Sequence, residues 1–142
     1  MSTETNKAVI RRYFEQVWKQ DRPDLFEEFI ADNVVHHGIE QVPGLEGMKA
    51  GYAMSLQAFP DLQLTIDDEI AEDDKVVIRW TLKATHQGEL MGIPGTGKKV
   101  MQSGFSIFRL ANAKVVELWF LADNMSMMQQ LGVIPTPGQN GS

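Results

Sequence analysis

The chain contains no cysteine among its 142 residues, which excludes disulfides, zinc–thiolate sites, iron–sulfur clusters and a cysteine nucleophile. Positive charge is also scarce. Thirteen lysines and arginines stand against 19 aspartates and glutamates, and the basic residues form no block. A net charge of -6 without a basic patch suits neither a phosphate backbone nor an anionic membrane. We therefore expect no nucleic acid and no membrane among the partners of this protein.

Long apolar runs are missing as well. No stretch approaches the roughly 20 apolar residues of a membrane-spanning helix, and residues 1–7 lack the apolar segment of a secretory signal. The expected location is therefore cytoplasmic. Histidine is rare, and the three present, His36, His37 and His86, do not have the spacing of two metal ligands on one helix. We expect no metal, although a site built from all three histidines stays open.

The hydrophobic content of 43% is enough for one core, so we expect a single domain over residues 1–134. Residues 135–142 combine prolines, glycines and polar residues, which predicts a flexible tail. Apolar residues recur at helical spacing in the first half of the chain, with predicted helices at 6–19, 24–30 and 48–59 and a short strand at 34–37. Alternation then predicts strands at 62–66, 76–86, 100–110 and 114–123, followed by a helix at 124–131. This order indicates an α+β fold, with helices on one face of an antiparallel sheet.

The last predicted strand ends in a carboxylate, Asp123. Alternation places one set of side chains on one face of this strand, Glu117, Trp119, Leu121 and Asp123, and a wholly apolar set on the other, Val116, Leu118, Phe120 and Ala122. An acid beside an indole and the following methionines loses hydration, which makes it a usable proton carrier. The alternative is that Asp123 caps the next helix. Amide hydrogen bonds would then hold it as an anion and make it a weaker base.

Several short motifs occur together in a characteristic order: Val35-His36-His37, Pro43-Gly44-Leu45-Glu46-Gly47, Phe59-Pro60-Asp61, Gly92-Ile93-Pro94-Gly95-Thr96-Gly97-Lys98, Lys114-Val115-Val116-Glu117-Leu118-Trp119 with Asp123, and Gln129-Gln130-Leu131-Gly132. In this order they resemble the SnoaL-like polyketide cyclases of the nuclear transport factor 2-like superfamily, from about Lys7 to Gly132. The resemblance implies a cystatin-like cone, in which three N-terminal helices pack on a curved antiparallel sheet. It also implies intramolecular aldol condensation without metal or cofactor, with Asp123 as the acid and base.

Cyclases of this family also use a catalytic histidine, on the strand equivalent to residues 101–110 of this chain. This segment contains no histidine, and its polar candidates are Gln102, Ser106 and Arg109. The hypothesis for the site therefore draws on other residues. We predict Asp123 and His37 as catalytic residues, with substrate contacts from Arg79, Trp80, Trp119, Phe105, Met54 and His86.

The two adjacent histidines point to opposite faces of a strand, and we expect His37 to point inward because it leads into a glycine loop. Arg79 would hold a carbonyl, or else lie on a solvated face, and His86 would contact substrate or be packed in the core. We expect a hydrophobic carbonyl compound as ligand and a homodimer through the sheet, centred on residues 115–120. The chemistry would be that of a cyclase, or of a lyase or isomerase, and the alternatives are a hydratase and a non-catalytic binding domain.

Overall fold

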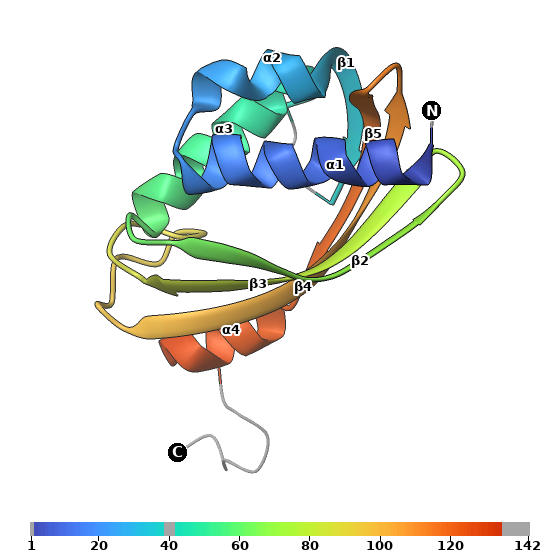
Figure 1. Ribbon diagram of the computed structural model, residues 1–142. Helices are drawn as coiled ribbons and strands as arrows, with labels where there is room; N and C mark the ends of the chain where they lie inside the picture. Colours follow the sequence, from blue (N-terminus) through green and yellow to red (C-terminus); the bar gives the residue numbers. More distant parts are fainter. Residues whose placement is uncertain (1, 39–41, 135–142) are drawn as a thin grey trace.

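The computed structural model describes residues 2–38 and 42–134, so the predicted tail lies outside the described residues. A five-stranded sheet has the strand order β1-β5-β4-β3-β2. Helices α1 to α3 cover one face of this sheet, and α4 lies on the other side of β4 (Figure 1). We call the face toward α1 to α3 the inner face and the opposite one the outer face. The α+β cone fold expected from the sequence is confirmed.

The strand bounds are β1 Ile30–His37, β2 Gln63–Glu72, β3 Lys75–Thr85, β4 Lys99–Ala111 and β5 Lys114–Ala122. Strands β2 to β5 form the predicted antiparallel meander. The first strand is longer than predicted and pairs in parallel with β5 at the edge of the sheet. No hairpin connects β1 to β5, so local turn chemistry does not set their relative direction.

The helices are α1 Thr3–Tyr13, α2 Phe26–Phe29, α3 Gly44–Ala58 and α4 Asn124–Leu131. The predicted helix at 6–19 is present, but its last part, Phe14–Lys19, is π-helical. The wider π turn lets Trp18 Nε1 donate to the hydroxyl of Tyr13, five residues earlier, at 3.1 Å. Helix α3 begins four residues before the predicted start, because Leu45 and Met48 already pack into the core. None of the helices in the described ranges is long and apolar enough to span a membrane.

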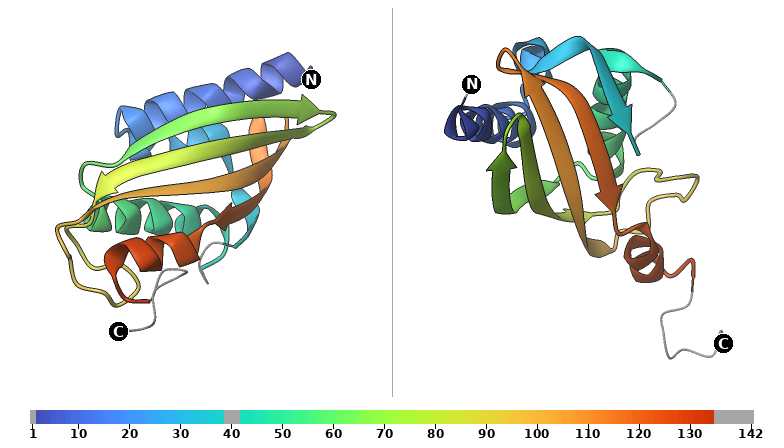
Figure 2. Two further views of the ribbon diagram at one scale, coloured as in Figure 1. Left: turned by 90° about the horizontal axis from the view of Figure 1, so that it is seen from below. Right: turned by 90° about the vertical axis from the view of Figure 1, so that its right-hand side faces the viewer.

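The core forms where the inner face meets α1 to α3. Figure 2 shows the helices and the sheet in two further views. Tyr13 of α1 lies at its centre, with edge-on contacts to four rings at centroid distances of 5.1 to 6.3 Å, those of Phe14, Phe26, Phe29 and Phe108. Alternation along β3 is confirmed, since Val76, Ile78, Trp80, Leu82 and Ala84 are all buried. Burial of these side chains provides the main stabilisation of the fold.

Trp119, predicted as a substrate contact, lies on the face of β5 that points away from the helices. Leu118 is 3% exposed and belongs to the inner face, whereas Leu121 is 74% exposed and lies on the outer face with Glu117 and Trp119. The register with β4 shifts between Arg109 and Leu110, so that Val116 is an extra residue in β5. From Glu117 to Ala122 the two faces are composed as predicted, and the apolar face packs against the helices.

The indole of Trp80 lies over Gly104 of the neighbouring strand. A Cβ atom on Gly104 would lie 2.2 Å from Trp80 Cζ2 and 2.6 Å from the carbonyl oxygen of Leu121. The indole stacks on Phe120 at 5.6 Å with an interplanar angle of 14°, and its Nε1 donates to Ser106 Oγ at 3.2 Å. The absence of a side chain at Gly104 therefore allows the flat arrangement of these rings.

Gly104→Ala is expected to lower the free energy of unfolding by about 1–3 kcal/mol, because the added methyl group overpacks the contact with Trp80. Chemical denaturation measures this loss. Ser103→Ala, at an exposed position on the same strand, is the control and should stay within about 0.5 kcal/mol of the parent protein. An unchanged midpoint for Gly104→Ala would show that the indole does not depend on this glycine.

Candidate active site

Aromatic and polar groups of β3, β4 and β5 meet on the inner face. Trp80 and Phe120 form a stacked pair, and Ser106 is 4% exposed beside them. Ser106 Oγ accepts the indole N–H, and its own hydroxyl proton has no other acceptor among the described residues. The inner face thus combines a flat apolar surface with a small polar group.

Asp123 lies directly beyond the end of β5. Its backbone N–H donates to Ser103 O at 3.0 Å, and its Oδ1 accepts from the Ser126 N–H at 3.0 Å, as the N-cap of α4. Gln102, which follows the inner parity of β4, donates to the Asp123 carbonyl oxygen at 3.3 Å and to Asn124 Oδ1 at 3.2 Å. Asp123 is therefore fixed in position by its backbone, its cap bond and Gln102.

The expectation that Asp123 is dehydrated is wrong, because the side chain is exposed. The strand has ended at this point, Trp119 lies on the outer face, and Met125 is 67% exposed. The capping alternative is realised through Oδ1 only. Oδ2 has no hydrogen bond within the described residues and remains available as an acceptor.

The orientation expected for the paired histidines is also reversed. His36 has the inner parity of Ile30 and Val34, and its ring lies near Gly47 of α3. His37 points to the outer face, where 46% of its side chain is exposed. The spacing of Ile30, Val34 and His36 is the sequence signal that would have identified His36 as the inward histidine.

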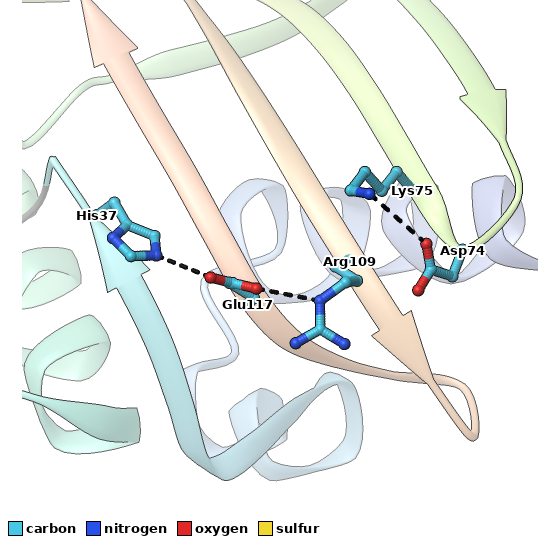
Figure 3. Close-up of polar contacts among 5 residues, drawn as sticks. All are labelled: His37, Asp74, Lys75, Arg109 and Glu117. Carbon is cyan, nitrogen blue, oxygen red and sulfur yellow. Dashed lines mark hydrogen bonds and ion pairs between the residues drawn. The ribbon is translucent and has the colours of Figure 1, made fainter.

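On the outer face, Glu117 bridges His37 and Arg109, as Figure 3 shows. Its Oε2 lies 2.9 Å from His37 Nε2, and its Oε1 accepts from Arg109 Nε at 3.0 Å. The His37 ring also stacks on Trp119 at 5.3 Å. The hydrogen bond with His37, and after it the one from Arg109, lowers the pKa of the Glu117 carboxyl despite partial desolvation. Predicted residues from three strands thus meet here, away from the helices.

The other predicted substrate contacts divide between the surfaces. Arg79 is ion-paired with Asp68 at 2.7 Å and with Asp67 at 3.6 Å, which matches the solvated alternative. Phe105 is 55% exposed on the outer face, and Met54 is 56% exposed on α3. By contrast, Trp80 and His86 are buried on the inner side.

His86 is fully buried, and Thr96 anchors its ring. Thr96 donates its N–H to His86 Nδ1 at 3.3 Å, and its hydroxyl lies 3.0 Å from the same nitrogen. An acceptor Nδ1 places the proton of the neutral ring on Nε2, which lacks a partner among the described residues. The Phe59 ring lies 5.9 Å away. The packed alternative weighed for His86 agrees with this environment.

Two surface hollows are present among the described residues, and neither is lined by Asp123, Trp80, Phe120 or a histidine. One of about 380 Å³ is lined by Arg11, Ile66, Asp67, Asp68 and Glu69. The other, of about 230 Å³, is lined by Asn6, Asp73, Asp74, Leu110, Ala111 and Asn112. Within residues 2–38 and 42–134, no three histidine or acidic side chains are grouped so that they could hold a metal ion.

A family model described as SnoaL-like polyketide cyclase matches residues 8–131 of the chain. The chain belongs to this family. No curated protein matches it significantly. The resemblance read from the sequence motifs is therefore confirmed, and it covers the whole cone.

Solved structures share the cone of this SnoaL-like protein. AclR from Streptomyces galilaeus, described as a candidate hydroxylase, is 30% identical with a TM-score of 0.85, over 97% of this chain and 87% of AclR. IdmH from Streptomyces antibioticus, described as a candidate polyketide cyclase, is 28% identical with a TM-score of 0.76, over 89% of this chain and 98% of IdmH. A SnoaL-like protein from Jannaschia, 24% identical over 94% of this chain and 95% of its own with a TM-score of 0.83, shows the shared fold.

The three polar candidates on β4, the strand that carries a catalytic histidine in the family, have distinct environments. Ser106 is buried on the inner face, Gln102 lies beside Asp123, and Arg109 pairs with Glu117 on the outer face. Of the three, Ser106 and Gln102 therefore have the inner parity of β4, and Arg109 has the outer one.

Glu117→Gln is expected to reduce the loss of stability on acidification. A carboxyl whose pKa is lowered by folding stabilises the protein above its unfolded pKa of about 4.3, and this contribution disappears as the pH falls through the lower folded value. Thermal unfolding between pH 7 and pH 3 measures the difference. The exposed Glu89, for which the structure shows no ion pair among the described residues, provides the control Glu89→Gln. A parallel pH profile for Glu117→Gln and the parent protein would contradict the proposed stabilisation.

Proposed function

We propose that this protein is a cofactor-independent acid–base enzyme that acts on a hydrophobic, carbonyl-bearing small molecule of polyketide type. The proposed reaction is intramolecular aldol condensation. The observation that carries the proposal is the match of the SnoaL-like cyclase family to residues 8–131, together with the free carboxylate oxygen of Asp123 at the end of β5. The stacked pair of Trp80 and Phe120 supports an apolar, planar ligand.

In the proposed reaction, Asp123 removes a proton from a carbon between two carbonyl groups and later returns a proton to the new alkoxide. The free Oδ2 supplies the lone pair, while the cap bond to Ser126 and the contacts of Gln102 hold the group in place. A β-dicarbonyl substrate delocalises the resulting carbanion over its own oxygens. Such chemistry needs an oriented base more than a metal ion or cofactor.

Asp123→Asn tests this role. Asparagine is also a favoured N-cap, so the helix start should be retained while the base is lost. The assay is enzyme-dependent exchange of the central protons of a naphthyl 1,3-diketone in D₂O, followed by NMR. We expect a reduction of at least about 100-fold, the scale of general-base catalysis, with an unchanged circular dichroism spectrum.

The control is Asp74→Asn, because Asp74 lies in the turn between β2 and β3, at the opposite end of the sheet from Asp123, where its carboxylate is 4.0 Å from Lys75 Nζ. Full exchange activity in Asp123→Asn would exclude Asp123 as the base. If the diketone bound to the parent protein without any exchange, this result would favour the non-catalytic binding alternative.

The likeness to AclR supports hydroxylation as a second candidate reaction at the same site. Both reactions begin with removal of a proton from an activated carbon, so they share the exchange step. Product mass separates them. The aldol ring closure described above leaves the mass unchanged, or lowers it by one water where the product dehydrates. Hydroxylation consumes dioxygen and an external two-electron reductant, adds one oxygen atom to the substrate and releases the other as water.

We also propose that the outer face forms a homodimer. Its exposed apolar residues come from adjacent strands, because Phe105 of β4 pairs directly with Leu121 of β5, and Val35 of β1 is 51% exposed. An exposed apolar patch on a sheet is typical of a protein interface. The predicted position for the dimer contact, β5, is retained, but the residues that form it are those of the outer parity.

Phe105→Glu is expected to convert the dimer into a monomer of 15.9 kDa, because association would bury an unpaired carboxylate. Sedimentation or light scattering measures the mass. Met91→Glu changes a residue of nearly the same exposure, 56% against 55%, in the loop between β3 and β4, and should leave the dimer intact. A monomeric parent protein at micromolar concentration would contradict this proposal.

A further inference from the structure

Both ring nitrogens of His36 are shielded from solvent, and neither has a hydrogen-bond partner among the described residues. A neutral imidazole carries one donor and one acceptor, so two polar functions are left without partners. Buried polar groups in folded proteins are nearly always hydrogen-bonded, and an unpaired one raises the free energy of the folded state. The structure of the protein alone gives no stabilising role to this imidazole.

The other two histidines have identifiable partners. His37 pairs with Glu117 and stacks on Trp119, whereas His86 is held through Nδ1 by Thr96. His36 is therefore the one histidine of this chain for which the described residues offer neither ring nitrogen a partner.

The pairing of β1 with β5 relates the position of His36 to the stacked pair of Trp80 and Phe120. In the parallel register His36 lies beside Leu118, so Phe120 is the next inward residue of β5 and a diagonal neighbour of His36. Phe120 in turn stacks on Trp80, whose indole N–H is bound by Ser106. The imidazole thus lies at the β1 side of the same inner surface.

Helix α3 leaves space for the ring. A Cβ atom on Gly47 would lie 2.7 Å from His36 Nε2, closer than real Cβ contacts allow. The imidazole therefore fits against bare helix backbone, between α3 and β1. Packing fixes the position of the ring, and the described residues supply no hydrogen bond to it.

We propose that His36 contacts the ligand, with its imidazole hydrogen-bonded to a carbonyl or enolate oxygen of a molecule that lies against Phe120. This inference rests on the proposed function for the class of ligand, but not for the state of the histidine. A donor in a water-poor site stabilises negative charge on an oxygen much better than water does. As Asp123 removes the proton, His36 would stabilise the charge that develops on the carbonyl oxygen.

The first test needs no substrate. His36→Phe replaces an unpartnered polar ring by an apolar ring of similar shape, so the melting temperature should rise by about 2 °C or more. If His36 made a structural hydrogen bond, the same substitution would lower the melting temperature. A fall in the melting temperature of His36→Phe therefore overturns the proposal.

The second test uses the naphthyl 1,3-diketone as the probe. In the parent protein, binding of the probe should shift the imidazole ¹⁵N signals of His36, and His36→Phe should weaken binding and slow proton exchange by about tenfold or more, the effect of one buried hydrogen bond. His36→Gln, which retains a donor and an acceptor, should recover part of the binding.

The outcomes separate the two proposals. Normal binding and exchange in His36→Phe overturn the role of His36 and leave the proposed function intact, as would a loss confined to His37→Phe. A shifted His36 signal in a parent protein that shows no exchange supports the contact while it contradicts the proposed reaction. Absence of any shift on saturation with the probe overturns the contact.

Discussion

The contact of Trp80 with Gly104 determines the shape of the inner face. Because Gly104 has no side chain, the indole of the next strand lies flat across it, reaches Phe120 on one side and donates to Ser106 on the other. Three strands are thereby joined by a stack, a hydrogen bond and a backbone contact, in addition to their ladder. A larger residue at position 104 would lift the indole away from the sheet and separate the groups that any ligand of this face would meet.

The sequence predicted the regular elements well, because alternating and helical periods are local properties. The strands β3 to β5 and the helix after Asp123 occur where the periodicity places them, whereas β2 extends six residues beyond the predicted 62–66. It did not predict which face of β5 meets the helices, since Trp119 and Leu121 are as apolar as Leu118 and Phe120. The extra residue Val116 and the distant parallel partner β1 decide this orientation, and neither leaves a local pattern.

Prediction of the site was limited in the same way, because a local pattern does not show which face of the sheet meets the helices. The family motifs identified Asp123, and the structure shows how its capping and acceptor functions can be divided between two carboxylate oxygens. The substrate contacts were chosen by residue type, so aromatic and basic residues of the outer face, such as Phe105 and Arg79, were grouped with inward ones such as Trp80. A side chain can be assigned to a site only when its face is known, and for this sheet the face depends on long-range pairing.

The adjacent histidines show what this division between faces means for the protein. His37 belongs to a network with Glu117 and Arg109, in which every member has an opposite charge or hydrogen-bond partner. Such a network satisfies its own groups and can be covered by another protein surface without a large loss of hydrogen bonds. His36, one residue earlier, has no partner among the described residues and lies on the inner face. A single strand thus presents a satisfied polar group to the face that we assign to association and an unsatisfied one to the face that we assign to the ligand. An unpaired buried polar atom raises the free energy of the folded state. A hydrogen bond from a polar oxygen of a ligand would therefore stabilise the inner face more than the outer one.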